Sequence, residues 1–285
     1  MSAFLRLPIT ILALAAATAS PMVRAANLKS ETLEAWDEYL RTANARIEPS
    51  SNPEGPFLWV DESTDRLSKV RKGEIVVSPA GPRIPLKVPS GLIHDWIGAA
   101  FLPNVTISDV LPVLRDYDHY QVFYHPNVIS SRALSLGDLE DRFSMMLMNK
   151  SLFSKLALDS DYQSSYNQVD ERRLYCVSQT TRIQEIAEYG VAGQHTLPED
   201  RGTGLIWRLY SVSRFEERDG GVYVEVEAIA LSRDIPAALR LVAEPIVRRV
   251  SRDALLTALS QTGKAVRSAA ADNHAGPQAK VRAIH

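Results

Sequence analysis

A β-hairpin that runs directly into a long helix, between Leu205 and Val266, constrains the fold of this chain most. The stretch Gly204–Glu217 alternates in the way of a strand with one buried face. Asp219-Gly220 is a strong signal for a two-residue hairpin turn, and Val222–Leu231 returns as the partner strand. A helical pattern then starts near Pro236. This order predicts an antiparallel sheet packed against a C-terminal helix.

The turn also predicts the register of the hairpin, because Arg218 then faces Gly221. One face would carry Trp207, Leu209, Ser211, Ser213 and Phe215 with Val222, Val224, Val226, Ala228 and Ala230. The other face would carry Arg208, Arg214, Glu225 and Glu227, with Arg214 opposite Glu225 as an exposed ion pair worth about 0.2–1 kcal/mol. The small residues of the apolar face leave room for the helix, a ligand or both.

Composition excludes several classes of function. The 285 residues, 45% of them hydrophobic, suffice for one large domain or a domain with extensions. The net charge of −2 and the scattered basic residues argue against a nucleic-acid partner. The single cysteine, Cys176, excludes an intrachain disulfide, and we expect it unpaired in a strand. The six histidines lack the spacing of metal ligands, so we expect neither a metal nor a cofactor.

The N-terminal residues 1–25 have the features of a signal peptide. Arg6 precedes the apolar run Ile9–Ala19, and Val23-Arg24-Ala25 places small residues at the cleavage positions. The run is too short for a transmembrane helix, and the flanking prolines disfavour a buried helix. We therefore expect a mature chain that begins near Ala26, is secreted or periplasmic, and has no integral membrane span.

The mature chain divides into an extension, residues 26–90, and a domain, residues 91–267. The extension has an amphipathic helix at Asn27–Ile47, a proline-rich stretch, and short strand candidates at Phe57–Val60 and Glu74–Val77. The domain has strand candidates and short helices in a fixed order: Leu92–Leu102, the helices Thr106–Asp116 and Tyr117–Tyr124, then the strands Asn127–Leu134, Asp141–Met148, Asp159–Gln168 and Arg172–Ile183. A polar loop, 188–203, precedes the hairpin.

The final helix has one apolar stripe made by Leu239, Val242, Ile246 and Val250. Pro245 lies inside the pattern, so either the helix kinks there or a short turn precedes a helix that starts at Pro245. Residues 268–285 are rich in alanine, glycine and charge, and we expect a disordered tail.

Between Gly91 and Arg267 this order of elements resembles the START-like or SRPBCC superfamily, which includes polyketide cyclases and pollen-allergen-like proteins. The residues that carry the resemblance are the strand Leu92–Leu102, the helix pair within Thr106–Tyr120, and the end from Leu231 to Val266. The resemblance implies an α+β helix-grip fold, in which a curved antiparallel sheet wraps a long C-terminal helix. It also implies an apolar ligand between the sheet and that helix. The N-terminal helical segment is additional to this fold.

The candidate ligand-binding residues are large or sulfur-containing side chains and small residues of the apolar face: Trp96, Met146, Met148, Trp207, Ser211, Ser213, Ala228 and Ala230. Alternation puts Met146 and Met148 on one face of their strand and Met145 on the other. The tryptophans are explained equally well by core packing. No nucleophile elbow is present, so we assign no catalytic residue.

Three hypotheses follow. The first is a secreted domain that binds a hydrophobic small molecule or lipid between the sheet and the C-terminal helix. The second is a cyclase- or hydrolase-like enzyme that uses an inward acid–base pair, such as His94 with Glu185 or Asp95. The third is a structural or protein-binding module with a closed core. The sequence does not name the ligand, the partner proteins or the oligomeric state.

Overall fold

The computed structural model describes residues 26–47, 56–150 and 155–274. Ten strands form one antiparallel sheet in the order β2-β4-β12-β11-β8-β7-β6-β5, with β3 beside β4 and β9 beside β8. Their bounds are Val76–Pro79 (β2), Leu86–Val88 (β3), Gly91–Pro103 (β4), Val128–Ser135 (β5), Glu140–Lys150 (β6), Lys155–Asp170 (β7), Arg173–Ala187 (β8), His195–Thr196 (β9), Arg208–Arg218 (β11) and Gly221–Arg233 (β12). A separate pair joins β1 (Ala26–Asn27) to β10 (Arg201–Gly202).

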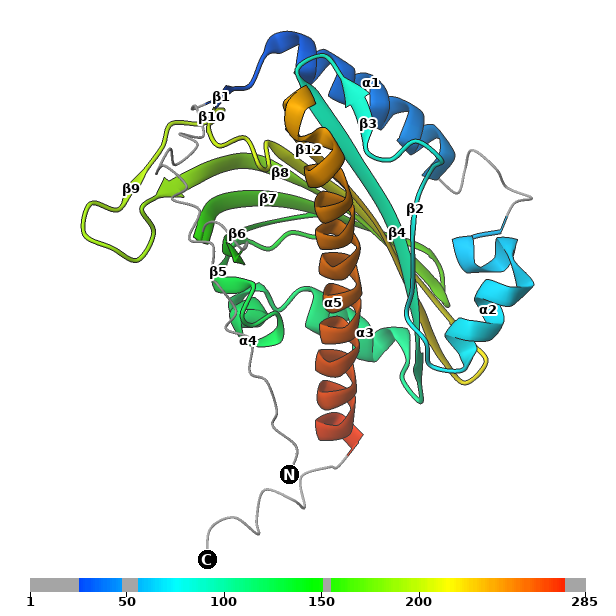
Figure 1. Cartoon of the computed structure of the whole chain (residues 1–285). Helices are drawn as coiled ribbons and strands as arrows, with labels where there is room; N and C mark the ends of the chain where they lie inside the picture. The colour runs from blue at the N-terminus through cyan, green and yellow to red at the C-terminus, as the bar shows by residue number, and fades with distance from the viewer. Residues whose placement is uncertain (1–25, 48–55, 151–154, 275–285) are drawn as a thin grey trace, which may run out of the picture.

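The sheet curves around the C-terminal helix α5, Arg240–His274, as Figure 1 shows. The face toward α5 is called the inner face here, and the opposite face the outer face. The helix contacts β4, β2 and β12, and its second half packs there through Leu255, Leu259 and Val266. Gly98 permits this close approach, because a Cβ at that position would lie 2.8 Å from Leu259 Cδ1. The predicted sheet and helix are confirmed.

Short helices pack on the inner face beside the second half of α5. The helix α3 spans Ile107–Leu114, and Thr106 is its N-cap residue. The backbone N–H of Thr106 donates to the Asp109 carboxylate at 2.9 Å. A single 3₁₀ turn, η3 (Tyr117–His119), and α4 (Tyr120–Phe123) follow and contact β5. The Tyr124 hydroxyl lies 3.0 Å from Thr262 Oγ1, which ties this segment to the second half of α5.

The N-terminal helix α1, Ser30–Ile47, covers part of the outer face. Its Trp36 and Ala43 belong to a buried cluster with Ile93 of β4 and Ile229 of β12. The amphipathic helix predicted from the sequence is confirmed. It is packed on the sheet as part of the same core.

The short helix α2, Thr64–Arg71, was not predicted, and it changes the environment of the charged residues. A 3₁₀ turn, η2 (Trp59–Glu62), precedes it where we expected the strand Phe57–Val60. Glu225 accepts a hydrogen bond from the Val60 amide at 3.3 Å. Arg214 and Glu225 do face each other with Nη1 and Oε1 3.0 Å apart, but their side chains are only 8% and 0% exposed. The prediction of an exposed pair is wrong because these turns cover the outer face.

The hairpin register is confirmed from Arg218–Gly221 to Arg208–Leu231. The inward placement of Trp207 is wrong, since its ring packs in the outer-face cluster with Trp36. The Trp207 amide donates to the Leu231 carbonyl at 2.7 Å, although Arg208 already faces Leu231. Trp207 and Arg208 therefore both lie opposite Leu231, which makes a β-bulge. The bulge breaks the alternation of the strand, so Trp207 points to the outer face.

Three further predictions concern the ends of the chain and Cys176. The structure extends α5 as one helix through Pro245 to His274, so residues 268–274 are helical where we expected a disordered tail. Cys176 is unpaired and buried in β8, as predicted. The predicted signal peptide, 1–25, and the rest of the tail, 275–285, lie outside the described residues. No helix of the described ranges is long and apolar enough to cross a membrane.

Candidate functional site

The centre of the inner face is a patch of small side chains, here called the small-residue patch: Ser211, Ser213, Ala228 and Ala230. The register places Ser211 directly opposite Ala228, and Leu209 opposite Ala230. All four residues stay partly exposed, although β11 and β12 are interior strands of the sheet with a neighbour on each side. Large residues farther along the same face, Phe215 and Val224, are buried beneath the helices. The predicted patch therefore exists, and its side chains are not fully covered by the rest of the described chain.

The first half of α5 leaves this region open. The least exposed residues of its first four turns include Glu244, Val247 and Ser251, which recur at helical spacing. The predicted apolar stripe is instead exposed: Leu239 57%, Val242 70%, Ile246 46% and Val250 46%. Only from Leu255 onward does the helix bury apolar side chains against the sheet. The helix thus holds one side of the inner face and does not seal its middle.

An aromatic stack forms the opposite side of the inner face. Phe143 of β6 lies between Tyr117 and Tyr162, with ring centroids 4.1 Å and 4.9 Å away and nearly parallel planes. Met145 and Leu209 pack against this stack. Stacked rings present a flat apolar wall beside the small-residue patch.

The methionines that we predicted for this wall are the wrong ones. Met145 shares the inner face with Phe143, so alternation places Met146 and Met148 on the outer face. Met146 is opposite Asp159, and Asp159 pairs with the Arg182 guanidinium at 3.0 Å. The charged neighbours of the outer face explain why the strand turns Met145 inward.

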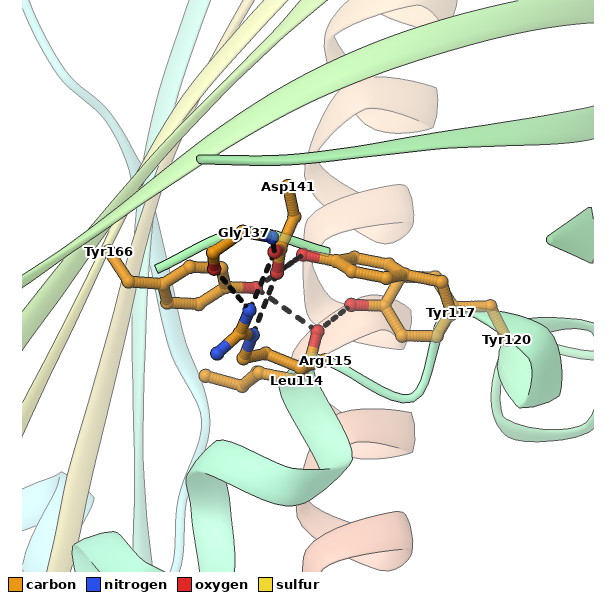
Figure 2. Close-up of polar contacts among 7 residues, drawn as sticks. All are labelled: Leu114, Arg115, Tyr117, Tyr120, Gly137, Asp141 and Tyr166. Atoms are coloured by element: carbon orange, nitrogen blue, oxygen red, sulfur yellow. Dashed lines mark hydrogen bonds and ion pairs between the residues drawn. The ribbon is translucent and has the colours of Figure 1, made fainter. Parts of the chain in front are cut away.

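A buried polar network, shown in Figure 2, adjoins the aromatic stack through Tyr117. The Asp141 carboxylate is fully buried and accepts two hydrogen bonds from Arg115, from Nε at 2.8 Å and from Nη2 at 2.6 Å. The Tyr117 hydroxyl and the Gly137 amide donate to the same carboxylate at 3.0 Å and 3.1 Å. The hydrogen bond and the charge of Asp141 raise the pKa of Arg115, so the guanidinium keeps its positive charge.

Two more tyrosines complete the network. The hydroxyls of Tyr117 and Tyr166 are 2.8 Å apart, and Tyr166 donates to the Leu114 carbonyl at 3.2 Å. Tyr120 donates to the same carbonyl. Burial raises the pKa of all three hydroxyls, which keeps them neutral. This network fixes η3 and α4 on the sheet, and its donors and acceptors are occupied by one another.

Sequence reasoning missed Arg115 and Asp141, although a signal was present. Asp141 alternates with Phe143 on a strand, so an inward phenylalanine implies an inward carboxylate. A buried carboxylate needs a cation, and Arg115 directly follows the apolar helix α3. These facts together would have indicated the pair.

On the other side of the small-residue patch, β4 places His94 and Trp96 on the inner face. They are the Cα partners of Ala230 and Ala228, and their exposed fractions are 6% and 7%. His94 Nε2 lies 2.9 Å from Ser232 Oγ. Burial lowers the pKa of His94 to about 4, so the imidazole is neutral at pH 7. The inward position of Trp96 agrees with the prediction.

The acid–base pair considered for the enzyme hypothesis does not form. The Glu185 carboxylate accepts hydrogen bonds from the Thr203 amide, the Thr203 hydroxyl and the Gly204 amide at 2.6–3.0 Å. Asp95 points to the outer face, where the Tyr39 hydroxyl donates to it at 2.7 Å. Neither carboxylate is a partner of His94. The residues that the structure describes include no group of three or more histidine, cysteine, aspartate or glutamate side chains able to hold a metal ion.

Trp207, the remaining candidate, borders a different hollow. This hollow has a volume of about 440 Å³ and lies where the described chain begins, between Leu28, Trp207, Arg233 and Asp234. It is outside the inner face. Trp207 is therefore separated from the other candidates by the thickness of the sheet.

The strand order and the position of α5 decide the architecture. The chain has the helix-grip fold. No family model matches the sequence, and no curated protein sequence matches it. Its structural neighbours are START, polyketide cyclase and Bet v1-like proteins of the SRPBCC superfamily.

Three neighbours illustrate the range of this helix-grip group. A STAR-related lipid transfer protein fragment from Xanthomonas axonopodis is 18% identical, with a TM-score of 0.41, and the match covers 68% of this chain and 98% of that one. Human STARD10 is 10% identical, with a TM-score of 0.42 and coverages of 75% and 82%. The Zhui aromatase/cyclase from Streptomyces sp. R1128 is 10% identical, with a TM-score of 0.37 and coverages of 64% and 93%.

Proposed function

We propose that this helix-grip protein binds a hydrophobic small molecule or lipid on the inner face, between the small-residue patch, the aromatic stack and α5. The observation that carries the proposal is the partial exposure of Ala228, Ala230, Ser211 and Ser213 at the centre of the sheet. Farther along the same strands Phe215 and Val224 are buried, whereas Leu209 and Val226 beside the patch are partly exposed as well. A ligand that covers the patch would remove apolar surface from water at about 25 cal/mol per Å².

The chemistry of the surrounding groups favours binding over catalysis. The guanidinium of Arg115 and the carboxylate of Asp141, beside the aromatic wall, are hydrogen-bonded to each other. The tyrosine hydroxyls beside them are held neutral by burial. Burial lowers the pKa of His94, so its imidazole is neutral at pH 7. In the proposed site these groups form the walls of the binding surface and orient the ligand.

Ala228→Phe tests the proposal. A phenyl ring at this position would occupy the space above the patch, so we expect it to abolish binding of a fluorescent fatty acid while the free energy of unfolding changes little. Fluorescence titration measures the binding, and urea denaturation measures the stability. Ala254→Phe is the matched control, because Ala254 is exposed on α5 and the same ring there leaves the patch free.

The opposite pair of results would reject the proposal. A wild-type protein that binds no apolar probe, together with an Ala228→Phe variant destabilised by about 1–3 kcal/mol or more, would indicate an overpacked, closed core. The protein would then be a structural or protein-binding module. If the predicted signal peptide is cleaved, the ligand is one that the protein meets outside the cytoplasm.

A further inference from the structure

Two buried nitrogen atoms beside the small-residue patch have no hydrogen-bond partner within the described residues: His94 Nδ1 and Trp96 Nε1. Both side chains are more than nine-tenths buried and lie two residues apart on the inner face of β4. Their Cα partners on β12 are Ala230 and Ala228, two residues of the small-residue patch. Buried polar atoms are nearly always paired, so two orphans at one place need an explanation.

The hydrogen bonds of Ser232 define what each nitrogen offers. Its hydroxyl donates to the Arg233 carbonyl at 3.2 Å and lies 2.9 Å from His94 Nε2. A hydroxyl has one proton, so with that proton on Arg233 it accepts from a proton on Nε2. This assignment of the tautomer from the network leaves a lone pair on Nδ1. Trp96 Nε1 carries a proton and can only donate.

We propose that the ligand carries a hydroxyl group, which accepts a hydrogen bond from Trp96 Nε1 and donates one to His94 Nδ1. This inference rests on the proposed function and specifies the ligand as an apolar alcohol. Among common oxygen groups, a hydroxyl both donates and accepts. An ether or ketone oxygen would satisfy Trp96 alone, and a carboxylate would face the lone pair of the histidine.

The spacing on β4 sets the condition for one bridging oxygen. Residues two apart on a strand are separated by about 6.6 Å along the backbone. An oxygen that bonds to two nitrogens at about 2.9 Å each can bridge as much as about 5.8 Å between them. One hydroxyl bridges both nitrogens when the two side chains lean toward each other over the alanines by about 1 Å or more. The hydrocarbon part of the ligand would then extend across the small-residue patch to the aromatic stack.

A matched set of ligands tests the inference. 1-Dodecanol, methyl dodecyl ether, dodecane and dodecanoate share one chain and differ in the polar group, and each is titrated against a bound fluorescent fatty acid. We expect wild-type protein to bind the alcohol about tenfold more tightly than the ether, since one additional buried hydrogen bond corresponds to that ratio. In His94→Phe and Trp96→Phe the alcohol should lose this preference, while the affinity for dodecane is kept.

The controls separate this inference from the proposed function. Tyr39→Phe removes a hydroxyl from the outer face and should leave the preference unchanged. Equal wild-type affinities for alcohol and ether, or a preference for dodecanoate, would reject the hydroxyl site and leave the apolar site standing. Failure of every ligand and of the probe to bind would reject both. The wild-type comparison needs no variant, so it decides the question even if Trp96→Phe does not fold.

Discussion

Glu225 is a single residue whose environment predicts a measurable pH dependence. Burial raises the pKa of its carboxyl group from 4.5 to about 7, against the opposing effects of Arg214 and of the Val60 amide. Between these two pH values the folded protein keeps a proton that the unfolded chain has lost. The stabilisation from this proton is therefore complete below pH 4.5 and disappears as the pH rises through 7.

Glu225→Gln should remove this dependence, because an amide does not titrate. We expect the free energy of unfolding of wild-type protein, relative to the variant, to fall by something on the order of 3 kcal/mol between pH 4.5 and pH 8. Urea denaturation at several pH values measures it. Glu171→Gln, at an exposed glutamate, should run parallel to wild type. If the stability curve of Glu225→Gln also ran parallel to that of wild type, the raised pKa of Glu225 would be contradicted.

For single residues, the sequence predicts which side chains lie opposite each other better than it predicts which side chains are buried. Arg214 opposite Glu225 follows from the turn alone, since Asp219-Gly220 determines every partner in the hairpin. That the pair is buried depends on η2 and α2, which come from a segment far away in the sequence. The bulge at Trp207 likewise has no local signal. Local rules decide which residues meet, and distant segments decide whether water reaches them.

At the scale of elements, the two halves of α5 should contribute very differently to stability. Leu259 is 2% exposed and lies directly over Gly98, whereas Val242 is 70% exposed. Leu259→Ala should cost about 2–5 kcal/mol. Val242→Ala should stay within about 0.5 kcal/mol, because it removes apolar surface that is already in water. Urea denaturation of both variants measures the difference, and similar losses would show that the first half of the helix is also packed in solution.

The helix illustrates what periodicity can and cannot predict. Val242, Ile246 and Val250 share one face of α5, as predicted, whereas Leu239 lies in a 3₁₀ turn, Ala237–Leu239, before the helix. That face of α5 does not meet the sheet, since the face that continues to Leu255 and Leu259 is the one in contact. Spacing identifies residues that lie together on a helix. Which way they point depends on where the helix is anchored, here by Leu259 and Thr262.

For the whole molecule, the order of strands and helices between Gly91 and the C-terminal helix was sufficient to predict the fold. Each of these elements has a local signal, such as the hairpin turn or the capped start of α3. The small-residue patch followed from the same register. The polar network of Arg115 and Asp141 was missed, because it is found only by combining two separate signals, an inward carboxylate on a strand and a cation at the end of an apolar helix. The extension was also interpreted as an addition to the domain, although α1 and α2 complete its outer face.

This last point predicts that the extension and the sheet unfold together. Trp36 of α1 is 5% exposed and packs with Ile93, Trp207 and Ile229. Trp36→Ala should cost about 3–5 kcal/mol and lower one common transition, because the cavity opens in the core of the sheet itself. Circular dichroism in the far and near ultraviolet would follow helices and aromatic packing through the same urea series. Glu34→Ala, exposed on the same helix, is the control and should leave the midpoint unchanged. Separate transitions, with the sheet unaffected by Trp36→Ala, would show instead that α1 is an independent unit resting on a sheet that is stable without it.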